Sequence, residues 1–133
     1  MKLYIASASA LPHLDTVEHF IRAITLGKKH EITYDWTRAV RNAGHGSPDD
    51  MSVRLAAVVQ DLAGVRAADL VWLLAPPADS KSTGAWVELG YALASAVPVI
   101  TSGDVKRCIF ADIAIKQFVT HDEAFMWLQG LPS

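Results

Sequence analysis

The chain has 133 residues, of which 51% are hydrophobic and 20% charged, and its net charge is −2. This composition predicts a single globular domain over residues 1–133 and excludes a disordered chain. The near-neutral charge creates no basic field, so neither a nucleic-acid polymer nor a membrane surface is expected as a partner. The single cysteine, Cys108, excludes an internal disulfide and a cysteine-based metal cluster.

The start of the chain raises the question of a signal peptide. No apolar run reaches the roughly 18–20 residues of a membrane span. The first ten residues, M-K-L-Y-I-A-S-A-S-A, resemble a signal peptide only superficially, because the apolar stretch Leu3–Ala6 is too short for one. A first strand over Lys2–Ala6 is the better interpretation, and we expect a cytoplasmic protein.

Strand and helix patterns alternate along the first half of the chain. Helical spacing over Leu14–Leu26 follows the first strand, and the alternation over His30–Trp36 predicts a second, half-buried strand. A loop is expected over Thr37–Ser47. Ser47 is then expected to cap a helix that runs to about Val65.

The second half continues the alternation. The apolar run Leu70–Ala75 predicts a central parallel strand that is covered on both faces. A buried helix over Gly84–Ala96, a strand over Val97–Thr101 and a strand over Gln117–Thr120 follow. Thr120 then opens the last helix with a capping box. Five strands with intervening helices predict an α/β fold, a flavodoxin-like doubly wound parallel sheet.

This architecture locates a binding site before any motif is considered. Ligands bind beyond the carboxyl ends of such strands where the strand order reverses, between the first and third strands of a 2-1-3-4-5 sheet. The two loops at that point contain small and hydroxyl residues, and they make four residues candidates for substrate binding: Ser7, Ser9, Thr83 and Gly84. The second loop enters a helix N-terminus, which attracts anions. Glycine-rich phosphate motifs are absent from the sequence, so we expect no nucleotide cofactor and no metal.

Glu88 is the only charged residue in the segment G-A-W-V-E-L-G-Y-A-L-A-S-A, which spans Gly84–Ala96. A carboxylate among apolar side chains is costly unless it is paired or shifts its pKa. It therefore indicates a structural ion pair, a working nucleophile or acid, or a glutamate exposed on one solvated stripe of the helix. Asp61 is unusual for a related reason, because it lies near the C-terminal end of its helix, where the macrodipole disfavours an acid.

Three segments together resemble the nucleoside 2-deoxyribosyltransferase superfamily, which includes the 2′-deoxynucleoside 5′-monophosphate N-glycosidases. They are Y-I-A at Tyr4, D-L-x-x-V-x-x-A-D from Asp61, and S-T-G-A-W-V-E-L-G-Y-A around Glu88. The resemblance implies a flavodoxin-like fold and cleavage of an N-glycosidic bond. It makes Glu88 the nucleophile that forms a covalent glycosyl intermediate. It also makes Asp61 the residue that positions substrate and protonates the leaving base, and it places Tyr4 near the sugar.

Two positions depart from the transferase pattern. Ser82 stands where transferases that act on free nucleosides usually have an acid, and there the chain resembles the monophosphate glycosidases, in which serine holds the 5′-phosphate. Ser82 or Thr83 is equally well interpreted as a helix cap. No counterpart of the transferases' carboxy-terminal asparagine is evident, and Ser102, Lys106 and Arg107 are candidates for phosphate contacts instead.

Other assignments remain open at this point. Trp36 either stacks on the base or packs in the core. The resemblance implies a homodimer or larger assembly, and we expect its interface near Trp86 or Leu93. The alternative functions are a Toll/interleukin-receptor-like NAD glycohydrolase and a non-catalytic nucleotide-binding domain. A binding domain would gain nothing from a buried Glu88, whereas a nucleoside or nucleotide substrate accounts for it.

Overall fold

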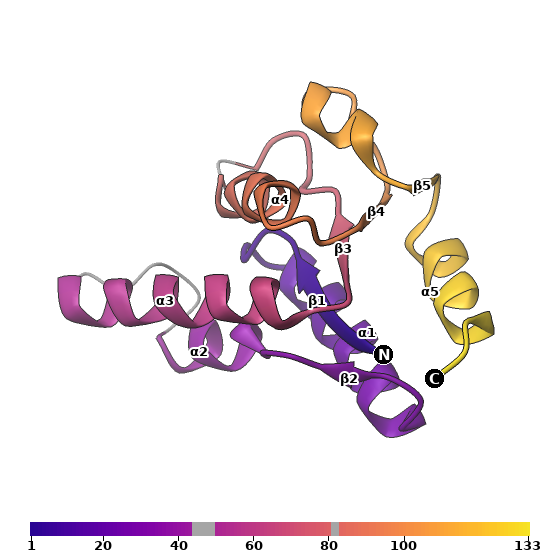
Figure 1. Ribbon diagram of the computed structural model, residues 1–133. Coiled ribbons are helices and arrows are strands. Elements are labelled where there is room, and N and C mark those ends of the chain that lie inside the picture. The colour runs from indigo at the N-terminus through magenta and orange to yellow at the C-terminus, as the bar shows by residue number, and fades with distance from the viewer. Residues whose placement is uncertain (44–49, 81–82) are drawn as a thin grey trace.

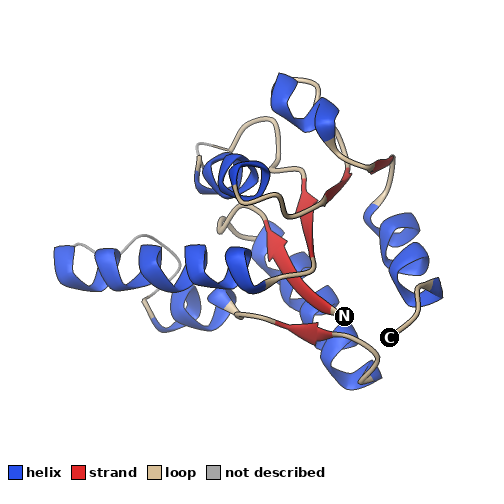
Figure 2. Cartoon of the chain, in the orientation of Figure 1, coloured by secondary structure: helices blue, strands red, loops and turns tan. Residues whose placement is uncertain are grey.

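A computed structural model describes residues 1–43, 50–80 and 83–133 of the chain. Five strands form one parallel sheet in the order β2-β1-β3-β4-β5 (Figure 2). The strands are Lys2–Ala6 (β1), Glu31–Ile32 (β2), Leu70–Leu74 (β3), Val99–Ser102 (β4) and Lys116–Phe118 (β5). The predicted flavodoxin-like, doubly wound α/β fold is therefore confirmed.

Helices cover both faces of this sheet (Figure 1). They are His13–Gly27 (α1), Trp36–Asn42 (α2), Met51–Ala67 (α3), Gly84–Ala94 (α4) and His121–Gly130 (α5), with a short 3-10 helix, η1, at Ile109–Ile113. Helices α3 and α4 pack against each other on one face. Helices α1 and α5 share the other face, where the rings of Phe20 and Phe125 lie 5.6 Å apart.

The central strands are buried because both faces carry a helix layer. All five residues of β3 are buried, as the continuous apolar run predicted. Side chains alternate between the faces, so the ring of Trp72 on β3 packs against Phe20 of α1. Tyr4 on β1 points to the opposite face, toward Glu88 of α4. Among the described residues, no helix is both long and apolar enough to cross a lipid bilayer.

The predicted strand over His30–Trp36 is wrong beyond its first residues. Only Glu31–Ile32 pairs with β1, and Trp36 begins α2 instead of ending a strand. The cause is local, because the Asp35 side chain accepts a hydrogen bond from the backbone N–H of Thr37 and caps a helix. The predicted loop over Thr37–Ser47 is therefore helical as far as Asn42.

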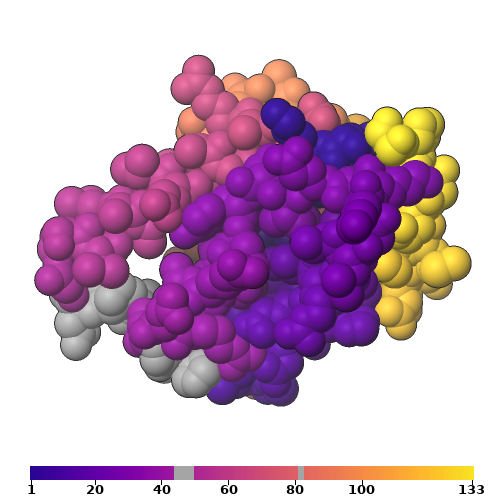
Figure 3. Space-filling view, turned by 90° about the horizontal axis from the view of Figure 1, so that it is seen from below, coloured from indigo at the N-terminus to yellow at the C-terminus, as the bar shows by residue number. Residues whose placement is uncertain are grey.

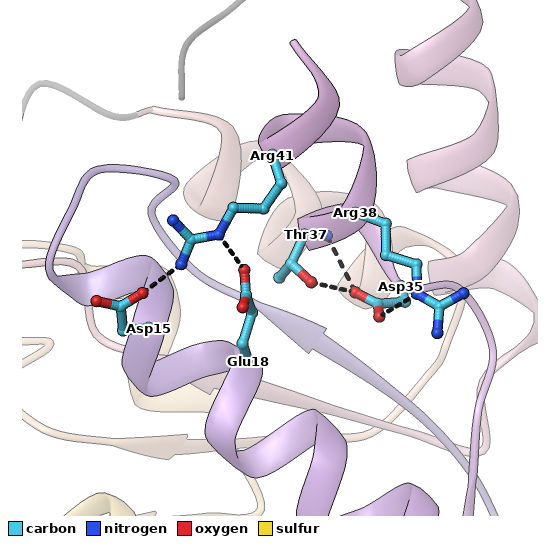
Figure 4. Close-up of polar contacts among 6 residues, drawn as sticks. All are labelled: Asp15, Glu18, Asp35, Thr37, Arg38 and Arg41. Atoms are coloured by element: carbon cyan, nitrogen blue, oxygen red, sulfur yellow. Dashed lines mark hydrogen bonds and ion pairs between the residues drawn. The ribbon is translucent and has the colours of Figure 1, made fainter. Parts of the chain in front are cut away.

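Helix α2 is held to α1 by charge. The Arg41 guanidinium reaches both Asp15 and Glu18 of α1, and Asp35 contacts Thr37 and Arg38 within its own segment (Figure 4). Exposed pairs of this kind contribute at most about 1 kcal/mol each. They fix the orientation of α2 more than they stabilise the fold.

The beginning of α3 also differs from the prediction. Ser47, the expected cap, lies outside the described residues. Asp50 caps α3 by accepting hydrogen bonds from the backbone N–H groups of Ser52 and Val53, at 2.8 and 3.3 Å. The helix then runs past Val65 to Ala67. Aspartate serves here as well as serine would, since either side chain satisfies the free N–H groups of a first turn.

Gly64 allows α3 to approach the sheet closely. A Cβ atom at this position would lie 2.9 Å from the ring of Tyr4 and 2.8 Å from the Cβ of Tyr34. The Gly64 carbonyl also accepts a hydrogen bond of 2.7 Å from the Thr33 hydroxyl, which ties α3 to the segment after β2. A glycine inside a helix costs about 1 kcal/mol relative to alanine. Close packing against Tyr4 explains why this cost is tolerated.

We predict that Gly64→Ala destabilises the protein. Overpacking against Tyr4 and Tyr34 should exceed the helix-propensity gain and lower the free energy of unfolding by about 1–2 kcal/mol in denaturant titrations. Gly90→Ala in α4 is the matched control, since a Cβ there meets nothing within 4 Å. That variant should be neutral or more stable. A Gly64→Ala protein as stable as the parent would contradict the close-packing account.

Candidate active site

The site centres on Glu88, which α4 carries on its buried face. Ala85, Leu89 and Ala92 share that face and bring the helix against the sheet. Glu88 is only 8% exposed, and its Oε2 accepts a hydrogen bond from the Tyr4 hydroxyl on β1. The residues that resemblance placed in one site, although 84 positions apart in sequence, are thus in direct contact. A phenol donor meets the requirement that a buried carboxyl be hydrogen-bonded.

Asp61 joins this pair from α3. Its side chain is half-buried, and its charge acts on both Glu88 and Tyr4. Gly64 lies one turn further along the same helix and contacts the Tyr4 ring, so the packing that admits Gly64 also brings Asp61 to the site. Asp69, which the sequence did not place in the site, instead accepts a hydrogen bond of 2.8 Å from the backbone N–H of Lys2.

Burial dominates the electrostatics of these three groups. The pKa of Glu88 is raised to about 8, mainly by burial; the Tyr4 hydrogen bond opposes the rise, and the charge of Asp61 contributes to it. Burial likewise raises the pKa of Asp61 to about 6. The pKa of Tyr4 is raised by burial and then by the nearby Glu88, so its hydroxyl stays protonated and can donate. Two carboxyls with raised pKa values, one of which acts electrostatically on the other, are typical of a site that transfers protons near neutral pH.

Ser7 and Ser102 lie at the carboxyl ends of β1 and β4, but their hydroxyls have protein partners. Ser7 donates a hydrogen bond of 2.9 Å to the Leu74 carbonyl and contacts His13 Nε2. Ser102 accepts a hydrogen bond of 2.8 Å from the Trp72 indole, and His121 Nδ1 lies 2.6 Å from its oxygen. These contacts belong to the α1 and α5 side of the sheet. Glu88 and Tyr4 face the other side.

Sequence reasoning missed the two histidines that meet these serines. The rings of His13 and His121 are 6.3 Å apart, and burial lowers the pKa of both. Each stands at the first position of its helix, α1 or α5, just beyond a strand end. A position directly after a helix N-cap at the carboxyl edge of a sheet is a usable signal, and the serine partners are near in sequence, Ser7 six residues before His13 and Ser102 nineteen before His121.

The remaining predicted substrate-binding residues occupy different positions. Trp36 is buried and donates its indole N–H to the Ile5 carbonyl at 2.7 Å, so its ring forms part of the core. Ser9 is half-buried in the loop after β1. Thr83 and Gly84 are exposed at the start of α4, and Thr83 holds the N-cap position without a side-chain capping bond to the described helix. Ser82 lies outside the described residues, and its role stays a prediction.

Arg107, a candidate for phosphate contact in the sequence, makes its contacts in the structure with protein groups. Its guanidinium donates hydrogen bonds to the carbonyls of Pro76, Pro77 and Ala78, at 3.1–3.3 Å. It also lies over the ring of Trp86, 5.3 Å from the ring centroid. Arg107 therefore links the loop after β4 to the loop that leads into α4. Within residues 1–43, 50–80 and 83–133, no group of three or more His, Cys, Asp or Glu is arranged to hold a metal ion.

The raised pKa of Glu88 predicts how stability depends on pH. Between its ordinary pKa of 4.5 and about 8, the folded chain holds the Glu88 proton more tightly than the unfolded chain does. The stabilisation is therefore complete below pH 4.5 and is lost as the pH rises to 8. Over this range the parent should lose about 2–4 kcal/mol more than Glu88→Gln does. Urea titrations at several pH values measure the difference, and parallel pH profiles would contradict the burial of an ionisable Glu88.

Comparisons with known proteins bear on the fold. No protein-family model matches the sequence, and no curated protein matches it. The structure is similar to that of the 2-deoxyribosyltransferase from the psychrotolerant bacterium Bacillus psychrosaccharolyticus, a biocatalyst for the synthesis of antiviral and antitumoral nucleosides. The TM-score is 0.69 at 19% sequence identity, and the match covers 94% of this chain and 90% of that one. The chain therefore has the flavodoxin-like fold of a 2-deoxyribosyltransferase over nearly its whole length.

Proposed function

We propose that this protein is an N-glycosidase or deoxyribosyltransferase that cleaves the N-glycosidic bond of a (deoxy)nucleoside or its 5′-monophosphate. The contact between Tyr4 and the buried Glu88, with Asp61 close by, is the observation that carries the proposal. The sequence resemblance and the structural similarity to a 2-deoxyribosyltransferase support it independently. No cofactor is required, since displacement at an anomeric carbon needs only a nucleophile and an acid.

The first step uses both carboxyls. Glu88 holds its proton more tightly than Asp61 does, because their pKa values are about 8 and about 6. Such a pair titrates as a unit, so the singly protonated pair prevails between these values. The reactive form has the proton on Asp61 and the charge on Glu88. An oxygen of Glu88 then bonds to the anomeric carbon, the bond to the base breaks, and Asp61 gives its proton to the departing nitrogen.

Tyr4 holds the nucleophile in place throughout. Its hydroxyl donates to one carboxyl oxygen, Oε2, which leaves the other, Oε1, for attack. The same hydrogen bond stabilises the ionised form of Glu88 when the proton moves to Asp61. In the second step, water attacks the anomeric carbon, the ester bond to Glu88 breaks, and Asp61 takes a proton from the water. A second base in place of that water gives transfer.

Recognition of a 5′-phosphate is the finer part of the proposal. The N-terminus of α4 presents a positive dipole end, and Thr83 and Gly84 are exposed there. Ser82, directly before them, would add a hydroxyl donor where an acid would repel phosphate. A 5′-monophosphate should therefore be a better substrate than the corresponding nucleoside. Similar kcat/KM values for the two would indicate a free-nucleoside enzyme, with the roles of Glu88 and Asp61 unchanged.

A panel assay tests the activity. The protein should release free base from at least one 2′-deoxynucleoside or its 5′-monophosphate, measured by chromatography with and without an added acceptor base. Glu88→Gln should lower the rate by at least about 10³-fold, because the nucleophile is lost. Glu31→Gln, at an exposed position of β2, is the matched control and should leave the rate unchanged.

Three outcomes would contradict the proposal. Near-normal turnover of the Glu88→Gln variant would remove Glu88 as the nucleophile. Release of nicotinamide from NAD, with every nucleoside and monophosphate left intact, would favour an NAD glycohydrolase instead. A protein that binds these nucleotides but cleaves none of them would be a binding domain on the same fold.

A further inference from the structure

Arg107 joins three segments of the chain beside the candidate site. It lies between β4 and η1, and its guanidinium donates hydrogen bonds to the carbonyls of Pro76, Pro77 and Ala78 at 3.1–3.3 Å. The same group lies over the ring of Trp86 on α4, 5.3 Å from its centroid. The loop after β3 and the η1 helix both lie at the end of the sheet toward which β1 and β3 point (Figure 1). The side chain therefore acts at the carboxyl edge of the sheet.

These contacts lie on both sides of the segment that the proposed function assigns to substrate binding. We call residues 75–83, between β3 and α4, the β3–α4 loop. Arg107 reaches the beginning of this loop through the three carbonyls, and through Trp86 it reaches the first turn of α4, just beyond the loop's end. Thr83 and Gly84 lie between these two attachments and are exposed. The guanidinium thus fixes the two ends of the loop relative to each other.

The loop needs a donor from elsewhere in the chain because of its own sequence. Proline has no backbone N–H, so Pro76 and Pro77 offer no donor with which this stretch could pair to a neighbouring segment. Pro76 is buried, and its carbonyl would be costly to leave without a donor. The planar guanidinium has five N–H donors, so it can meet several carbonyls and still stack on an aromatic ring. A lysine ammonium is a compact point charge and cannot replace it.

We propose that Arg107 is a positioning residue for substrate binding. It holds the β3–α4 loop and the first turn of α4 in the arrangement that receives the substrate, without touching the substrate itself. The inference rests on the proposed function. Glu88 keeps its contact with Tyr4 on the buried face of α4 through groups that Arg107 does not touch. Loss of Arg107 should therefore weaken substrate binding and leave the chemical step nearly intact.

Hydrogen exchange tests the holding of the loop without any substrate. The N–H of Ser80 donates to the Pro77 carbonyl at 2.9 Å, and the N–H of Trp86 donates to the Thr83 carbonyl at 3.1 Å. In Arg107→Ala these two amides should exchange at least about 5-fold faster, measured by NMR, since both bonds lie in segments that the guanidinium holds. The amides of β1 should keep their rates, which separates a local loosening from a general loss of stability.

Arg22→Ala is the matched control. Arg22 is an exposed arginine of α1. Helix α1 forms part of the surface that is turned to the viewer in Figure 3, whereas the β3–α4 loop lies at the upper end of Figure 1. This variant also removes one guanidinium, but far from the loop. It should leave both amide exchange and turnover at the parent level.

Steady-state kinetics separate positioning from a direct contact with phosphate. Arg107→Ala should raise KM at least about 10-fold for a 2′-deoxynucleoside and for its 5′-monophosphate alike, with kcat within about 3-fold of the parent. Arg107→Lys keeps the charge but not the planar fork of donors, so its KM should lie between those of the parent and the alanine variant. A guanidinium that bound phosphate itself would instead affect the KM of the monophosphate alone.

Three results would overturn the positioning role. They are parent exchange rates together with parent KM in Arg107→Ala, a loss confined to the monophosphate, and a fall in kcat at unchanged KM, which would mean that Arg107 only maintains the fold. A parent protein that cleaves neither class of substrate would remove the proposed function instead. The exchange rates would then decide whether Arg107 holds the loop, with faster exchange supporting it and unchanged rates overturning it.

Discussion

The hydrogen bond from the Tyr4 hydroxyl to the Glu88 carboxyl connects the sheet to the helix that carries the proposed nucleophile. Helix α4 could not bury a carboxyl against β1 without a donor, because an unpaired buried polar group costs roughly 1–3 kcal/mol or more. On its other side the Tyr4 ring lies close to α3, which the missing side chain of Gly64 permits. Asp61 reaches the same point through that close packing. The packing of α3 and α4 against the sheet thus also forms the candidate site.

The two faces of the sheet differ in what their polar groups do. On the α1 and α5 face, Ser7 and Ser102 meet protein partners, among them His13 and His121. These contacts hold the carboxyl ends of the strands together. On the α3 and α4 face the polar groups are two carboxyls with raised pKa values beside a phenol, centred on Glu88. We therefore assign the proposed reaction, which needs a nucleophile and an acid, to that face.

Long and strongly patterned segments could be predicted from sequence, and short ones could not. The apolar run of β3 and the capped helix after Thr120 leave little choice of structure. Three alternating residues that end at Trp36 fit a strand, but the same pattern also fits a helix that begins at Trp36. Only the Asp35 cap decides between strand and helix. Glu88 was evident from its apolar neighbours. Its contact with Tyr4 required the family resemblance, because nothing local relates residues 84 positions apart.

The central claim is that Glu88 forms a covalent bond to the sugar, and the most direct measurement is the mass of the Glu88 peptide after rapid acid quenching during turnover. The account predicts a peptide heavier by one deoxyribosyl or deoxyribosyl-phosphate group, with the added mass located on Glu88 by fragmentation. Added base or longer incubation should remove the adduct. Steady release of base with no adduct at any quench time, or with an adduct on another residue, would contradict the claim.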